Sequence, residues 1–228
     1  MNNISVIQDS CVGCRSCEQV CPKGCIAIEE NKEGFLYPKV ANHECIKCGL
    51  CLKSCPVQNK SSHRNIPAEV WGFRDKNDIQ IMRSASGGVA CVAARLIIEK
   101  GGIVFGAAYD DQLVVRHIEI AEKNDVEKLQ SSKYVQSDTG ECFKKVKRYL
   151  KAGRKVLFTG TPCQIAGLYA FLGGDDLNLY TMDIICHGVP SPKFFKKYLD
   201  YQSKKLGEDV LFYNFRSKEK KDGVLSIL

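Results

Sequence analysis

From Val70 onward, short apolar runs alternate with longer segments of helical periodicity. The runs that predict strands are 70–74, 103–109, 113–120, 155–159, 177–186 and 210–215. Amphipathic segments that can form crossover helices separate several of these runs. This part of the chain is therefore expected to form an α/β domain with a mostly parallel or mixed sheet.

Local signals place the helices between these strands. A helix is expected after Gly88 and another before Gly153, since glycine commonly ends helices or precedes their first turn. The apolar positions of the first helix, which should form its buried face, are Val89, Val92, Ala93, Leu96 and Ile97. Those of the second helix are Phe143, Val146 and Leu150, and a capping box formed by Asp138 and Glu141 precedes them. Two more helices begin at Thr161-Pro162 and Ser191-Pro192, and a short one covers 124–130.

The first 60 residues differ, because they hold nine of the thirteen cysteines. Two runs have the form C-x2-C-x2-C-x3-C-P, namely CVGCRSCEQVCP and CIKCGLCLKSCP. Such a run supplies three corners of one iron-sulfur cube, and its fourth cysteine ligates the other cube in two-cluster ferredoxins. We therefore expect two 4Fe-4S clusters in a ferredoxin-like α+β module. The predicted ligands are Cys11, Cys14, Cys17 and Cys55 for the first, and Cys21, Cys45, Cys48 and Cys51 for the second.

Other uses of these cysteines fit the pattern less well. Disulfides are disfavoured by the repeated spacing, and zinc sites usually take two separated pairs rather than four cysteines in a row. Cys25 is outside both sets, and a small core residue beside a cluster is the preferred interpretation over a ligand. Short strands are expected at 26–28 and 34–38.

Composition limits the remaining possibilities. The apolar content of 44% and charged content of 26% are globular values. The formal charge of +7 falls to about +3 once eight thiolates bind two cubes, which does not favour a nucleic-acid partner. No apolar stretch is long enough for a membrane span, so a cytoplasmic protein is expected. A redox partner protein or subunit is expected as well. The expected units are a cluster module at 1–60, a linker at 61–69 and the α/β domain at 70–228.

Three loops lie at junctions where a strand ends or a helix begins, and open α/β sheets bind their ligands at such junctions. Ser84-Ala-Ser-Gly-Gly88 offers hydroxyls and backbone amides, although a cap without a ligand is as plausible. Gly160-Thr161-Pro162-Cys163-Gln164 places a thiol in the first turn of a helix. Cys186-His187-Gly188 follows a neighbouring strand, so Cys163 and Cys186 could share a ligand or be simple buried cysteines. Cys91 and Cys142 are expected to be structural, and His117 a paired polar residue.

The segments SASGG, SSKYVQS, GTPCQIAGL and CHGVPSP, in this order behind the cysteine runs, resemble the coenzyme F420 hydrogenase/dehydrogenase beta subunit family. They resemble in particular its bacterial members with an N-terminal ferredoxin domain. The resemblance implies an iron-sulfur flavoprotein that passes electrons between clusters, FAD and a small-molecule acceptor such as coenzyme F420.

The resemblance also assigns residues. It implies that Cys163 and Cys186 hold part of a third 4Fe-4S cluster. The cofactor-binding residues that it implies, including the helix cap at Thr161, are Ser84, Ser86, Gly87, Gly88, Lys133 and Thr161. Family members continue past an FRSK-like stretch and carry a later C-x2-C pair, whereas this chain ends KDGVLSIL, which suggests a truncated sequence. The alternative is a non-catalytic electron-transfer subunit or an inactive fragment.

Overall fold

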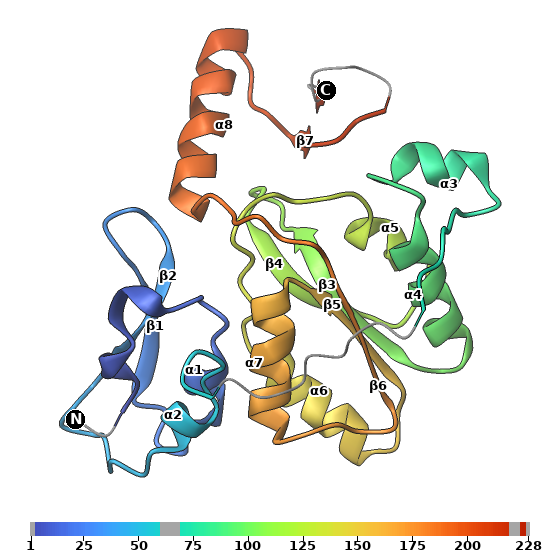
Figure 1. Ribbon diagram of the computed structural model, residues 1–228. Helices are drawn as coiled ribbons and strands as arrows, with labels where there is room; N and C mark the ends of the chain where they lie inside the picture. Colours follow the sequence, from blue (N-terminus) through green and yellow to red (C-terminus); the bar gives the residue numbers. More distant parts are fainter. Residues whose placement is uncertain (1–2, 60–68, 219–223, 227–228) are drawn as a thin grey trace.

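A computed structural model describes residues 3–59, 69–218 and 224–226 (Figure 1). The N-terminal module contains one β-hairpin and several short helices. Its elements are η1 (Ile4–Val6), η2 (Gln8–Ser10), α1 (Ser16–Val20), β1 (Ile26–Glu30), β2 (Leu36–Val40) and α2 (Leu50–Lys53). Most of the expected linker, 61–69, lies outside the described residues.

The second part of the chain is the α/β unit. Its helices are α3 (Asp78–Arg83), α4 (Val89–Glu99), η3 (Lys123–Asp125), α5 (Val126–Leu129), α6 (Cys142–Lys151), α7 (Pro162–Leu172) and α8 (Pro192–Leu206). Its strands are β3 (Ile103–Tyr109), β4 (Val115–Ile120), β5 (Val156–Gly160), β6 (Leu179–Asp183), β7 (Phe212–Asn214) and β8 (Val224–Ser226). The last two strands pair with each other rather than with the main sheet.

The main sheet has the order β4-β3-β5-β6 and is mixed, as the sequence predicted. β4 is antiparallel to β3, whereas β3, β5 and β6 are parallel. The carboxyl ends of these three strands, at Tyr109, Gly160 and Asp183, therefore lie along one edge of the sheet. We call this the carboxyl edge. Helix α4 runs into β3 through a short turn, so its N-terminus also lies at this edge.

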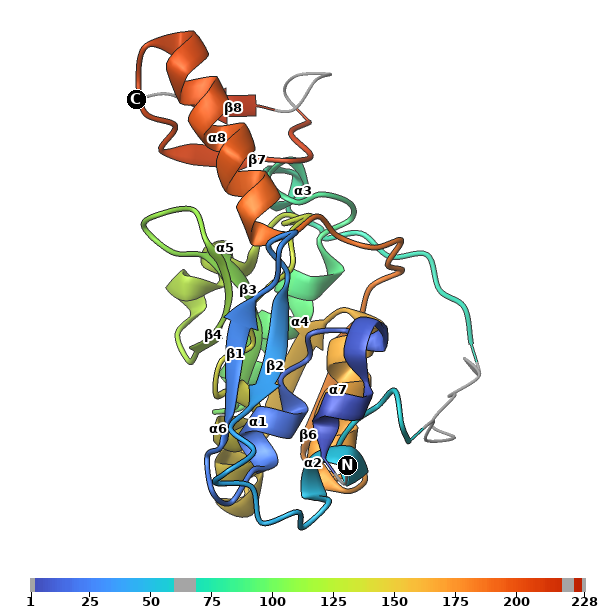
Figure 2. The ribbon, with the colours of Figure 1, turned by 90° about the vertical axis from the view of Figure 1, so that its left-hand side faces the viewer.

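Alternating side chains divide the core between the two faces of the sheet. Phe105 and Phe158 pack toward α6 and α7, in a cluster with Phe143 and Leu168. On the other face, β3 and β5 pack toward α4 and α5. Figures 1 and 2 show helices on both faces, which is the three-layer arrangement that crossover connections produce.

Two expectations were wrong, one for residues 70–74 and one for the buried face of α4. Residues 70–74 do not form a strand: no described strand pairs with them, and the Val70 and Trp71 side chains are 92% and 80% exposed. Helix α4 forms as expected, but it is rotated relative to the expected stripe. Val89 and Leu96 are exposed, and the small residues Cys91 and Ala94 face the sheet instead.

The expected capping box at Asp138 and Glu141 was also wrong. The Asp138 side chain accepts a hydrogen bond from the Gly140 N–H rather than from helix α6. The N-terminus of α6 is instead capped from the cluster module, where Gln19 Oε1 accepts hydrogen bonds from the Phe143 N–H at 2.9 Å and the Lys144 N–H at 3.2 Å. By contrast, Thr161 and Gln164 form a capping box that the sequence had indicated only as an N-cap.

Polar contacts hold the cluster module against the α/β unit. Arg15 forms ion pairs with Glu18 and with Asp138, which also pairs with Arg116. At the β-hairpin, the Ser191 hydroxyl donates to the Glu33 carbonyl at 2.6 Å. Figure 2 shows this hairpin beside the start of α8. The two parts are therefore joined at both ends of the module.

Among the residues that the structure describes, no helix is both long and apolar enough to cross a bilayer.

We predict that Gln19→Ala lowers the free energy of unfolding by about 1–3 kcal/mol, because two N–H groups at the buried start of α6 lose their acceptor. Gln19→Glu keeps an acceptor oxygen at a helix N-terminus and is the matched control. Urea unfolding of both variants measures the difference. Equal losses in the two variants would show that packing, not the cap, explains the effect.

His117 provides a second prediction. Its ring is 7% exposed, lies between the Ser137 hydroxyl and the Thr159 carbonyl, and stacks on Phe158. Burial lowers the pKa of His117 to about 4. The unfolded chain therefore binds this proton first, and stability falls as the pH drops from about 6.5 toward 4, by about 3 kcal/mol. Urea unfolding across this range should show a slope that His117→Asn reduces; an unchanged slope in the variant would contradict the assignment.

Candidate functional site

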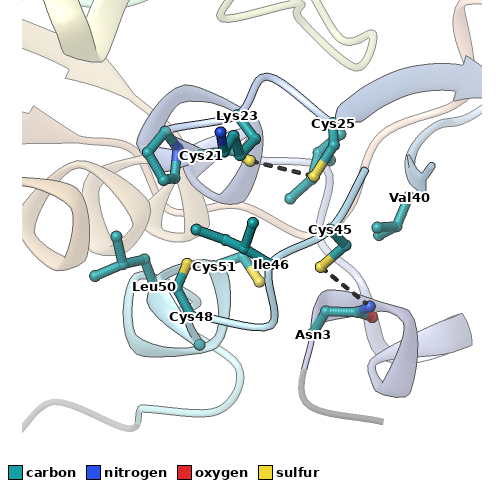
Figure 3. A pocket seen from close by; sticks show the side chains of 13 residues that line it. Asn3, Cys21, Lys23, Cys25, Val40, Cys45, Ile46, Cys48, Leu50 and Cys51 are labelled. Atoms are coloured by element: carbon teal, nitrogen blue, oxygen red, sulfur yellow. Dashed lines mark hydrogen bonds between the residues drawn. The ribbon is translucent and has the colours of Figure 1, made fainter. Parts of the chain in front are cut away.

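The second expected ligand set surrounds one cavity of the cluster module. Cys21, Cys45, Cys48 and Cys51 all line it, together with Cys25. Figure 3 shows the sulfurs of these residues around the same space, below the loop that carries Lys23. Cys48 is exposed, and its neighbour Ile46 is 56% exposed, so this cavity lies near the protein surface.

The first expected set surrounds a separate cavity. Its lining includes Cys11, Cys14, Cys17 and Cys55. Cys55 follows α2 and reaches the cavity formed by the first run, whereas Cys21 follows α1 and reaches the cavity of the second. The interleaved pairing that the spacing predicted is therefore compatible with the fold.

The chemistry of these cavities fits clusters better than free thiols. Burial raises the pKa of Cys14 to about 12 and also raises that of Cys17, so these thiols ionise readily only beside a compensating cation. Within the described ranges, no three His, Cys, Asp or Glu side chains converge on a single metal ion. A cube of irons and sulfides holds its thiolates farther apart than one ion does, which agrees with four cysteines lining each cavity.

The first cavity abuts helix α7 of the α/β unit. A Cβ atom added to Gly167 would lie 2.9 Å from both Cβ and Sγ of Cys14, so only glycine permits this approach. The Thr139 hydroxyl, ahead of α6, donates to the Cys14 carbonyl at 3.1 Å. One turn before Gly167, the Cys163 thiol is close enough to contribute to the raised pKa of Cys11 and of Cys14 by charge repulsion, after the larger effect of burial.

Cys163 and Cys186 follow the neighbouring strands β5 and β6 at equivalent positions. The register pairs Gly160 with Asp183, and each cysteine follows its paired residue by three positions. Cys163 contacts the Thr161 hydroxyl at 3.0 Å, and Cys186 is exposed. The sequence therefore placed both thiols at the carboxyl edge correctly. Whether they bind a cluster remains a prediction.

The SASGG and SSKYVQS segments also meet at this edge. Ser84 is 4% exposed, donates to the Gln80 carbonyl and accepts from Gln130 Nε2 at 2.8 Å. Lys133 lies over the Tyr109 ring and donates to backbone carbonyls, the shortest contact being 2.8 Å to Gln130; burial lowers its pKa to about 8. Both side chains therefore stabilise the protein itself in this structure.

The two glycines of the SASGG segment are required by the fold itself. Gly88 has φ +83° at the N-cap of α4, and a Cβ at Gly87 would lie 2.4 Å from the Phe73 carbonyl oxygen. Ser86 is exposed beside the first turn of the helix. Lys218, which the sequence interpretation missed, donates to the carbonyls of Ile81 and Ser86, each at 2.7 Å. Its position in the FRSK stretch, one of the segments that resemble the family, could have pointed to it.

Comparisons with known proteins agree with these features. Residues 153–227 match the family model for the C terminus of the coenzyme F420 hydrogenase/dehydrogenase beta subunit, and residues 10–59 match the 4Fe-4S dicluster domain. The resemblance seen in the sequence motifs is confirmed: the C-terminal third of the chain matches this family's model, and the N-terminal part matches a 4Fe-4S dicluster domain.

Individual relatives extend the match. One subunit of the F(420)H(2) dehydrogenase of Methanosarcina mazei is 27% identical over 175 residues, which is 70% of this chain and 48% of that protein. Ferredoxin-1 of Caulobacter vibrioides is 41% identical over 54 residues, or 23% of this chain and 43% of that protein. A chain of the F420-reducing [NiFe] hydrogenase complex from Methanosarcina barkeri aligns with a TM-score of 0.45 and 17% identity, over 57% of this chain and 48% of that one. The chain spans about half the length of these relatives.

We predict that Cys55→Ala removes about half of the iron from the anaerobically reconstituted protein, because the first cavity loses a ligand while the second keeps four. Iron and sulfide analysis measures the loss. Cys142→Ala, which changes a buried cysteine of α6 outside both cavities, is the control and should retain all of the iron. Full iron in the Cys55 variant would contradict the assignment of Cys55 as a ligand.

Proposed function

We propose that this chain is an iron-sulfur flavoprotein oxidoreductase that passes electrons between a ferredoxin-type donor and an organic two-electron acceptor similar to coenzyme F420. In this proposal the clusters lie in the two cysteine-lined cavities of the N-terminal module. FAD binds at the carboxyl edge of the sheet, and Cys163 and Cys186 provide part of a third 4Fe-4S site between them. When bound, the clusters supply one-electron transfer and the flavin supplies two-electron exchange with the acceptor.

The observation that carries this proposal is the contact between the first cavity and α7. Gly167 packs on Cys14, and Cys163 in the first turn of the same helix acts on the thiols of Cys11 and Cys14. Helix α7 begins at the carboxyl edge, directly after β5. The cavity expected to hold the first cluster thus faces the helix that leads to the proposed flavin site. The second cavity, with exposed Cys48, faces solvent, and we propose that the electron donor docks there.

Residues at the carboxyl edge have properties that suit a flavin nucleotide. The first N–H groups of α4 lack partners within the helix and attract phosphate oxygens, and exposed Ser86 stands beside them. The buried hydroxyl of Tyr109 has no hydrogen-bond partner among the described residues, which leaves one polar group available for a ligand. Lys133 and Lys218 add positive charge near the same loops.

Each residue of the proposed flavin site has its own role. Gly88 and Ser86 would bind phosphate oxygens, while Thr161 holds the first turn of α7 and contacts Cys163. Ser84 would act indirectly, by joining Gln130 to the loop after α3. The fold already brings these residues to one edge of the sheet.

We predict that the reconstituted protein binds FAD, seen as a flavin absorption band that remains with the protein after desalting. Ser86→Asp should weaken FAD binding at least about tenfold, because a carboxylate at the α4 N-terminus repels the phosphates. Asn124→Asp adds the same charge in η3, after β4 and so at the opposite edge, and should leave the affinity unchanged. Fluorescence titration of FAD measures all three proteins.

Two results would contradict the proposal in different ways. A chain that holds both clusters but binds no flavin would be the alternative, a ferredoxin-like electron-transfer subunit without its own catalytic site. Flavin binding that Ser86→Asp does not weaken would place the flavin away from the N-terminus of α4.

A further inference from the structure

Cys25 is a fifth cysteine of the second cavity. It lies directly before β1, is 5% exposed and lines the same space as Cys21, Cys45, Cys48 and Cys51. Its Sγ lies 3.5 Å from Sγ of Cys21, a distance that permits a hydrogen bond between the two sulfurs (Figure 3). The four-cysteine set is complete without it, so the family pattern gives Cys25 no role.

The backbone fixes this position. The Gly24 N–H donates to the Cys21 carbonyl at 3.3 Å, and Gly24 has φ +61°, so residues 21–25 form a tight loop. The Ala41 N–H donates to the Cys25 carbonyl at 2.8 Å and ties the end of the loop to the strand β2 side of the hairpin. The Cys25 sulfur is therefore held beside Cys21 by the fold rather than by chance rotation of an exposed side chain.

The two cavities differ in this respect. No cysteine beyond the four expected ligands lines the first cavity, whose described lining is otherwise mostly apolar. The second cavity receives a further side-chain donor, since Asn3 Nδ2 lies 3.7 Å from Sγ of Cys45. Two of the four sulfurs that would bind the second cluster thus face a side-chain donor.

We propose that Cys25 is a positioning residue of the second cluster: its S–H donates a hydrogen bond to the sulfur of Cys21 and raises the reduction potential of that cluster. The proposal rests on the presence of the cluster in the second cavity. A hydrogen bond between two sulfurs needs one proton, and an iron-bound thiolate cannot supply it, so Cys25 is the donor. Reduction adds negative charge to the cluster and its sulfurs, and a donor aimed at one of them stabilises the reduced state.

The test compares Cys25→Ala and Cys25→Ser in the full chain after anaerobic reconstitution, with potentials measured by redox titration followed by electron paramagnetic resonance. Cys25→Ala should keep all of the iron, shift one of the two cluster potentials to a more negative value and leave the other unchanged. Cys25→Ser retains a hydrogen-bond donor, so its potential should lie close to that of the wild-type protein. Cys142→Ala removes an equally buried cysteine of α6 and should change neither potential.

The other outcomes overturn the inference. Unchanged potentials in Cys25→Ala, or equal shifts in the Ala and Ser variants, would leave Cys25 as a core residue only. Loss of about half of the iron in Cys25→Ala would make it a ligand instead of a donor. A wild-type chain that takes up no iron would overturn the proposed function itself, a result that is distinguishable because it precedes any comparison of variants.

Discussion

The close packing of Cys14 on Gly167 is the constraint on which the arrangement of the two parts depends. It places the wall of the first cavity against a helix that starts at the carboxyl edge of the sheet. Polar contacts surround it: the Thr139 hydroxyl donates to the Cys14 carbonyl, Arg15 pairs with Asp138, and Gln19 caps α6. The segment that carries the first three expected ligands therefore also forms much of the interface, which the β-hairpin completes through Glu33 and Ser191.

Much of the site could be predicted from the sequence, because its signals are local. Ligand spacing within C-x2-C-x2-C-x3-C-P fixed which cysteines surround each cavity, and the Thr161-Pro162 start of α7 follows from the chemistry of helix caps. Cys163 and Cys186 were placed on adjacent loops that follow two strands, and the register of β5 and β6 agrees.

The features that the sequence did not predict depend on distant contacts. Gln19 caps a helix more than a hundred residues away, which no capping-box pattern near Asp138 could reveal. The expected strand at 70–74 found no partner among the described strands, although its composition suits one. The buried face of α4 consists of Cys91, Ala94 and Ile97, of which the expected stripe included only Ile97. These residues pack in one cluster with Val104 and Leu157 of the sheet, contacts that helical periodicity alone does not reveal.

Gly167 also has a consequence for electron transfer itself. Electron tunnelling slows steeply with the separation of donor and acceptor, so a single methyl group at this position, which would have to push α7 away from Cys14, would lengthen the path from the first cavity to the carboxyl edge. The absence of a Cβ at position 167 thus permits the close approach of Cys14 to α7. For the proposed function, this glycine keeps the distance between the first cavity and the carboxyl edge short.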